Sequence, residues 1–206
     1  MNNREDYLLV LWEYGESHGH VTEKNICDRL GTSPATVSEA LSKMTEDGLI
    51  SRGGRNFFLT KRGMELALPS VRVHRISEVF SYRFLEVPWE DVHASVMEME
   101  HVFKGKMVNS LNKNLGYPST CPHGNPVTPD SIPPEVRAAT SEPGIYSLVR
   151  VTLEDHSLLK SLADIQALPG TVVELVEGEV TTLKTQNGEL KLNRPAAQSV
   201  RLRRIQ

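Results

Sequence analysis

Apolar residues recur at helical spacing through the first fifty positions of the chain. The pattern predicts one helix over residues 5–14, a second over 22–30 that ends at Gly31, and a third that begins at Pro34 and stops before Gly48. The hydroxyl of Ser33, directly before the third helix, makes this residue a candidate N-cap. Three short helices in this order predict a helical unit with a turn between its second and third members.

The next segment, residues 49–63, alternates apolar and polar side chains on both sides of Gly53–Gly54, which predicts a two-stranded hairpin with a basic tip. Helices followed by a basic hairpin form the layout of a winged helix-turn-helix, in which the last helix enters the major groove and the hairpin, or wing, contacts the DNA backbone. A helical unit without DNA is the alternative. The small polar residues Thr36 and Ser38 on the third helix favour DNA binding.

Helical periodicity returns over residues 63–85, with an interruption at Pro69, and again after Pro88. A last helical run ends at Gly116. Seven prolines then fall within residues 117–144, which predicts an extended linker because proline cannot donate a backbone hydrogen bond.

Short segments of alternating apolar and polar residues follow, separated by Gly170, Gly178, Gly188 and Pro195. They predict a small antiparallel barrel of SH3-like size. The expected fold is therefore α+β and multidomain: an N-terminal winged helix-turn-helix, a helical dimerisation domain, a proline-rich linker and a C-terminal SH3-like small β-barrel, over residues 1–64, 65–118, 119–142 and 143–206.

Composition and charge limit the classes of function that the chain can have. Of the 206 residues, 39% are hydrophobic and 24% charged, and no run approaches the roughly 18 apolar residues that cross a bilayer. The N-terminus has no basic region before an apolar run, so we expect a cytoplasmic protein with no membrane partner. The net charge of −3 does not itself indicate a nucleic-acid partner, but residues 33–62 carry five basic and three acidic side chains.

Polar groups occupy helical faces that normally belong to the core. His93, Met97, Glu100 and His101 fall at positions i, i+4, i+7 and i+8 of one helix, and His74 and Glu78 are four residues apart on another. A lone buried histidine is usually a satisfied core residue. Several ionisable groups on shared faces are costly to bury unless they pair or bind a metal, and carboxylate, imidazole and thioether donors suit Mn(II) or Fe(II).

An enzyme has little support. The chain lacks the HExxH, GxSxG and P-loop motifs, so a metal-dependent hydrolase is a remote alternative and no small-molecule substrate is expected.

Several segments together resemble one known family. EDYLLVLWEY, SPATVSEALSKMTEDGLI, VHRISEVF, EHVF, YPSTCPHGNP and LPGTVVEL follow in the order found in the DtxR/MntR metalloregulators, in the long form that keeps an SH3-like (FeoA-like) domain. The resemblance covers nearly the whole chain. It implies a homodimeric transcription factor that binds an inverted-repeat operator on double-stranded DNA when loaded with Fe(II) or Mn(II), usually as a repressor of metal-uptake genes. A DNA-binding protein with a purely structural metal is the alternative.

The resemblance also implies metal ligands. The primary site would be Asp6, Met97, Glu100 and His101. The second site has two versions in the family: one would use His74, Glu78 and His93, and the other would use Glu78, Cys121, His123 and an acid from the barrel. Asp155 aligns best with that acid, and Glu154 and His156 are near alternatives.

The primary set is a hybrid. Asp6 is similar to the manganese-responsive members, whereas the soft sulfur of Met97 favours Fe(II), so the physiological ion stays open between the two. We expect Co(II), Ni(II) and Zn(II) to bind in vitro as well.

The predicted DNA contacts lie on the third helix and the wing. Thr36 and Ser38 would contact phosphates or base edges, Ala35 and Glu39 would face the groove, and the wing arginines would hold the backbone. The full predicted set is Ser33, Ala35, Thr36, Ser38, Glu39, Arg52 and Arg55.

Overall fold

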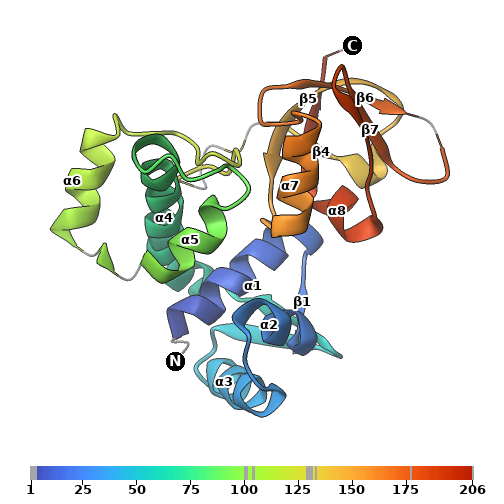
Figure 1. Ribbon diagram of the computed structural model, residues 1–206. Helices are drawn as coiled ribbons and strands as arrows, with labels where there is room; N and C mark the ends of the chain where they lie inside the picture. Colours follow the sequence, from blue (N-terminus) through green and yellow to red (C-terminus); the bar gives the residue numbers. More distant parts are fainter. Residues whose placement is uncertain are drawn as a thin grey trace. The chain divides into compact units, whose positions relative to one another are not determined.

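The computed structural model (Figure 1) describes residues 4–99, 102–103, 105–128, 132, 134–176 and 178–205. The chain divides into two compact units, Met1–Val71 and Arg72–Gln206. None of the described helices is both long enough and apolar enough to pass through a lipid bilayer.

The N-terminal unit combines three helices with a small sheet. Its elements are α1 (Arg4–His18), β1 (Val21–Thr22), α2 (Glu23–Leu30), α3 (Pro34–Glu46), β2 (Ile50–Gly53), β3 (Asn56–Leu59) and the start of α4 (Lys61–Phe84). The strands pair antiparallel in the order β1-β3-β2, and Gly54 and Arg55 form the turn between β2 and β3. This arrangement confirms the predicted winged helix-turn-helix, with the wing turn one residue later than expected.

Local side-chain chemistry fixes the turn before α3. Thr22 accepts a hydrogen bond from the backbone N–H of Asn25, whose side chain accepts one from the N–H of Thr22 in return. Gly31 ends α2 with a φ of 59°, a left-handed conformation that glycine adopts without steric cost. The hydroxyl of Ser33 then accepts from the N–H of Thr36 and begins α3. These caps hold one face of α3 on the core through Val37 and leave the opposite face exposed.

Helix α4 differs from the expectation at Pro69. The proline stands inside a continuous helix of 24 residues and does not interrupt it. Its ring is exposed, and the long helix keeps its regular bonds on both sides of the one that proline removes. The helical bonds on both sides of Pro69 therefore keep the helix continuous despite the intrinsic preference of proline.

The C-terminal unit begins with the rest of α4, followed by α5 (Val92–Met99) and α6 (Lys106–Asn114). A first apolar cluster joins α4 and α6 to the segment that follows them: Ile76, Val79, Val108, Leu115, Cys121 and Val127.

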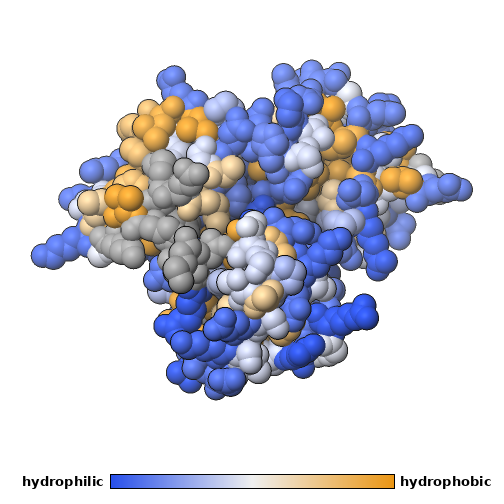
Figure 2. All heavy atoms as spheres, turned by 60° about the horizontal axis from the view of Figure 1, so that its bottom comes forward, coloured by the Kyte–Doolittle hydropathy of each residue, from blue (hydrophilic) through white to orange (hydrophobic). Residues whose placement is uncertain are grey.

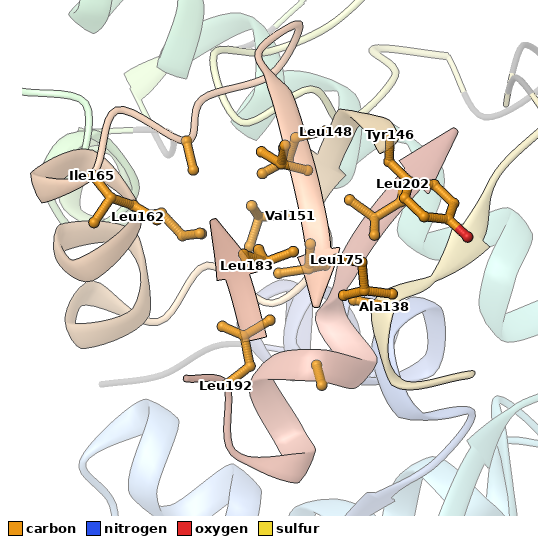
Figure 3. Close-up of a cluster of buried hydrophobic side chains, with 14 of the residues drawn as sticks. Ala138, Tyr146, Leu148, Val151, Leu162, Ile165, Leu175, Leu183, Leu192 and Leu202 are labelled. Carbon is orange, nitrogen blue, oxygen red and sulfur yellow. The ribbon is translucent and has the colours of Figure 1, made fainter. Parts of the chain in front are cut away.

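Six antiparallel strands complete this unit, in the order β4-β9-β5-β6-β7-β8. They are β4 (Val136–Arg137), β5 (Gly144–Val151), β6 (Val172–Val176), β7 (Thr182–Thr185), β8 (Gly188–Lys191) and β9 (Val200–Arg204). Leu148, Leu183 and Leu202 gather between the strands with Leu162 of α7 (His156–Asp164) (Figure 3). The sheet agrees with the predicted SH3-like fold, whereas η3 (Ala138–Thr140), α7 and α8 (Arg194–Ser199) were not predicted.

The proline-rich segment is only partly an extended linker. Residues 121–127 are buried apart from a half-buried Pro122, so this part of the expectation is wrong. The carbonyl of Pro122 accepts a hydrogen bond from the indole N–H of Trp89, and that of Pro126 accepts from the guanidinium of Arg75. Proline has no N–H to donate, but its carbonyl oxygen can accept a hydrogen bond from a side chain. The two prolines therefore help to hold this loop in place.

Candidate metal centre and nucleic-acid interface

Six buried side chains converge inside the C-terminal unit. They come from four places in the chain: His74 and Glu78 on α4, His93 on α5, Cys121 and His123 on the buried loop 121–127, and Glu154 between β5 and α7. We call them the His/Glu/Cys cluster. The i, i+4 spacing on α4 puts its first two members on one face, one turn apart.

Glu78 lies at the middle of the cluster and is fully buried. Its Oε1 is 3.2 Å from His74 Nε2, 3.5 Å from His93 Nδ1 and 3.4 Å from His123 Nδ1. Burial would raise the pKa of Glu78, but His74 and His123 outweigh it and hold that pKa well below its ordinary value. Among the described residues neither carboxylate oxygen has a hydrogen-bond partner, so a charged carboxylate is buried beside three imidazoles and the second carboxylate of Glu154.

Glu154 faces the same nitrogens from the barrel side. Its Oε2 is 2.6 Å from His93 Nδ1 and 3.3 Å from His123 Nδ1, and its Oε1 accepts a 2.6 Å bond from the amide of Asn125. Burial and the charge of Glu78 would raise the pKa of Glu154, but His123 and His93 outweigh them and lower it. The carboxylate is therefore ionised at neutral pH.

The ring of His123 is held in the orientation typical of a metal ligand. Its Nε2 lies 2.9 Å from the carbonyl oxygen of Trp89, which can only accept, so the neutral ring carries its proton on Nε2 and its lone pair on Nδ1. Burial would lower the pKa of His123, but Glu154 and Glu78 outweigh it and raise the pKa well above its ordinary value. The two carboxylates thus favour the positively charged form of the ring.

Cys121 completes the cluster with a soft donor. Its Sγ lies 4.0 Å from Glu154 Oε1. Burial and then the charges of Glu78 and Glu154 raise the pKa of the Cys121 thiol, so the metal-free residue is a neutral thiol. Imidazole, carboxylate and thiol groups packed at these distances are the donor types that first-row divalent cations bind. The three imidazoles and the thiol are more groups than the two carboxylates need as ion-pair partners. The residues present therefore fit a divalent metal.

Gly124 explains why this loop can approach the barrel so closely. It has a φ of 85°, and a Cβ at this position would meet the carbonyl oxygen of Val149 at 2.2 Å. Next to it, the amide of Asn125 donates to Val151 O at 2.7 Å, and the N–H of Val151 donates to His123 O at 2.9 Å. These contacts with β5 place the two donors of the loop beside Glu154.

The structure separates the three alternatives for the barrel acid. The side chain of Asp155 accepts from the N–H of Leu158 as the exposed N-cap of α7, and His156 is exposed beside Asp91. Glu154, one residue earlier, is the acid that lies in the cluster. The two versions of the second site, predicted as alternatives, are brought together in one place.

The predicted primary site is only partly described. Asp6 is a buried residue of α1 in the N-terminal unit, and Met97 is a half-buried residue of α5 in the C-terminal unit. Glu100 and His101 lie outside the described residues.

The predicted DNA contacts are all exposed: Ser33, Ala35, Thr36, Ser38, Glu39, Arg52 and Arg55. On the wing, Arg52 Nε donates to Gly54 O at 3.0 Å and the guanidinium lies 5.5 Å from the ring centroid of Phe57, while Arg55 stands in the turn itself. The N-terminal unit shows a mostly hydrophilic surface in Figure 2.

The sequence predicts Glu154 only as an alternative to Asp155, and it does not indicate the two residues that support the cluster, Trp89 and Asn125. A signal was available for Glu154: an aspartate directly before the apolar period of residues 156–164 is a typical N-cap, which would have assigned Asp155 to the helix and left Glu154 for the cluster.

Two family profiles match the chain. One, described as the N-terminal DNA-binding domain of iron-dependent repressors, matches residues 1–55, and the other, described as their metal-binding and dimerisation domain, matches residues 60–129. Among curated relatives, the iron-dependent repressor IdeR of Mycobacterium tuberculosis is 35% identical over 128 residues, which cover 62% of this chain and 56% of the relative. That match thus spans little more than half the length of the mycobacterial protein. The diphtheria toxin repressor of Corynebacterium diphtheriae is 26% identical over 222 residues, covering 100% of this chain and 98% of the relative.

Solved structures give a similar result. A manganese-dependent transcriptional repressor in complex with manganese has a TM-score of 0.82 and 27% identity, over 97% of this chain and 99% of that one. The crystal structure of T. acidophilum IdeR has a TM-score of 0.89 and 22% identity, over 98% of each chain, which supports the fold.

Proposed function

The chain belongs to the iron-dependent repressor family, and on that premise we propose that it is a transcriptional regulator that binds DNA when loaded with Fe(II) or Mn(II). The observation that carries the proposal is the pairing of an exposed polar α3 in a winged helix-turn-helix with a buried His/Glu/Cys cluster that fits a divalent cation. Such a regulator acts in the cytoplasm and most simply represses genes of metal uptake.

Binding as a homodimer to an inverted repeat is part of the proposal. The C-terminal end of α4 and the start of α6 expose large apolar side chains, among them Phe84, Leu85 and Met107. Figure 2 shows apolar surface on the upper left lobe, which holds α4 to α6. Exposed apolar area of this kind supports a second copy of the chain as partner. A symmetric dimer would present two α3 helices to half-sites about 34 Å apart, or a multiple of that distance.

The regulatory ion would be held by Asp6, Met97, Glu100 and His101. These residues are divided between the two units, so an ion bound to all of them would favour one arrangement of the DNA-binding unit. It would act as a ligand with different affinities for two conformational states. The second ion-binding region, the His/Glu/Cys cluster, lies within the C-terminal unit alone.

The test is a binding experiment under anaerobic conditions. Genomic fragments are selected with chelator-treated protein, alone and with Fe(II) or Mn(II), and the selected fragments are measured by fluorescence anisotropy. The proposal predicts an inverted repeat that is bound only with metal, and the more effective ion identifies the effector. Equal binding without metal would instead favour a DNA-binding protein whose metal is purely structural.

A further inference from the structure

We propose that the His/Glu/Cys cluster is a dinuclear centre, in which Glu78 and Glu154 bridge two different divalent-cation positions. This inference rests on the proposed function, since it specifies how many ions the metal-loaded regulator holds in this region and which residues hold each one.

The donors divide into two sets of four that share both carboxylates. One set is His74, Glu78, His93 and Glu154, and the other is Glu78, Cys121, His123 and Glu154. Within each set the ligand atoms all lie within 4.8 Å of one another. The two imidazoles of α4 and α5 thus belong to the first set alone, and the two donors of loop 121–127 belong to the second set alone.

The span of a single ion explains why this division matters. Bonds from first-row divalent cations to nitrogen or oxygen are about 2.1 Å long, so two donors of one ion lie at most about 4.2 Å apart. The ligand atoms of each set lie within 4.8 Å of one another, which is close to this distance, whereas the six side chains together do not form one such set. One ion could therefore use either set, and only two ions use all the donors without rearranging the loop.

The carboxylates are close to members of both sets. Glu78 Oε1 is 3.2 Å from His74 Nε2 of the first set and 3.4 Å from His123 Nδ1 of the second. Glu154 Oε2 is likewise 2.6 Å from His93 Nδ1 and 3.3 Å from His123 Nδ1. Donors bound to one ion at right angles are about 3 Å apart, so each oxygen has the spacing of a ligand toward both sets.

The charge count is compatible with two ions. Glu78, Glu154 and the thiolate form of Cys121 supply three negative charges, against four positive charges from two dications. A single dication is already neutralised by the two carboxylates, and it would leave Cys121 as a buried thiol beside the centre. Since a coordinated thiol is deprotonated, the second ion gives this sulfur its role as a ligand.

The two positions differ in chemical preference. Two imidazoles and two carboxylates form a nitrogen and oxygen set that suits Mn(II) or Fe(II). Replacing one imidazole by a thiolate makes the second set softer, so Zn(II), Co(II) or Fe(II) is favoured there over Mn(II). The centre can therefore hold two unlike metals.

The experiment counts ions in a protein whose predicted primary site is disabled by Asp6→Ala. After equilibrium dialysis against Co(II), elemental analysis gives the number of ions per protomer, and absorption spectroscopy detects the thiolate-to-cobalt charge-transfer band. We expect two ions with the band. Adding His74→Ala and His93→Ala should leave one ion and the band, whereas adding Cys121→Ser and His123→Ala should leave one ion without it.

Electron paramagnetic resonance of the Asp6→Ala protein, with Mn(II) added until two ions are bound per protomer, tests the bridge directly. Two bridged ions are magnetically coupled, so the ordinary six-line signal should be lost or broadened. It should return when either pair of ligands, His74 and His93 or Cys121 and His123, is replaced. Asp155→Asn, next to Glu154 and still able to cap α7, is the matched control and should keep both ions. Circular dichroism verifies that each variant folds, and only folded variants are compared.

The dinuclear centre would be overturned if the protein held a single ion and lost it in both ligand-pair variants. Two ions without magnetic coupling would also overturn it. These results leave the regulatory proposal intact if DNA binding still requires metal. Two coupled ions in a protein that binds DNA equally without metal would support the dinuclear centre and contradict the regulatory proposal.

Discussion

Glu154 contacts His93, His123 and Asn125 at once, whereas its neighbour Asp155 is occupied with the first turn of α7. Both are acids, so the sequence predicts a carboxylate at this point of the barrel. The preference of aspartate for an N-cap indicates that Glu154 is the one that turns inward, but the side chains that it meets depend on the path of the chain between β5 and α7. At the scale of the residue, the type of side chain was therefore predictable and its contacts were not.

The two acids make a direct mutational comparison. Glu154→Gln keeps the shape of the side chain and removes the charge, so it should weaken Mn(II) or Co(II) binding to the cluster by more than about tenfold. Asp155→Asn removes a charge one residue away and should change that affinity by less than about twofold, since Asn also caps helices. Isothermal titration of both variants, each in the Asp6→Ala background, measures the difference. Equal losses would show that the cluster responds only to overall charge.

Gly124 offers a test of stability at the same scale. Gly124→Ala forces a left-handed residue and a Cβ against the backbone of β5, so we expect the free energy of unfolding to fall by about 2–4 kcal/mol. Gly116 also has a positive φ, of 77°, but no atom lies within 4 Å of its added Cβ. Gly116→Ala should therefore cost only about 1 kcal/mol. Urea unfolding of the metal-free proteins compares them, and similar losses would mean that the close approach to β5 relaxes freely.

Elements were predictable where periodicity and local caps agree. The order of helices and wing in the N-terminal unit follows from apolar spacing, from Ser33 and Pro34 before α3, and from Gly31 after α2. The five longer strands of the barrel follow from alternation. Helix α7 has an N-cap aspartate and an apolar period that the strand patterns on both sides obscured, and α8, with six residues, is too short to show one. Pro69 and loop 121–127 were misjudged for the opposite reason, since tertiary packing overrides the tendency of proline to end structure.

The wing is the element whose function is simplest to test. Arg55→Ala should weaken binding to all DNA sequences alike and reduce the slope of log K against log salt by about 1, because one phosphate contact is lost. Fluorescence anisotropy over a range of salt concentrations, on the operator and on a scrambled duplex, measures both effects. Lys24→Ala, which removes an exposed cation from α2, is the comparison. A change in sequence preference with an unchanged salt slope would place Arg55 at the bases instead.

At the scale of the whole molecule, the two compact units divide the metal ligands unequally. All six members of the His/Glu/Cys cluster belong to residues 72–206, whereas the ligands proposed for the regulatory ion come from both units. The cluster is therefore expected to stabilise the C-terminal unit, and the primary ion is expected to control DNA binding. Periodicity could predict the three folded regions but not this division, since residues as distant as His74 and Glu154 meet only in the folded chain.

Coupling between metal and DNA is the central claim, and thermodynamic linkage makes it reciprocal. The most direct measurement is the affinity of the protein for Mn(II) or Fe(II), under anaerobic conditions, in the absence and in the presence of saturating operator. The proposed regulator predicts tighter metal binding with operator, by a factor of about 5 to 150, and no such change in the Asp6→Ala variant. Equal affinities with and without operator would contradict the account.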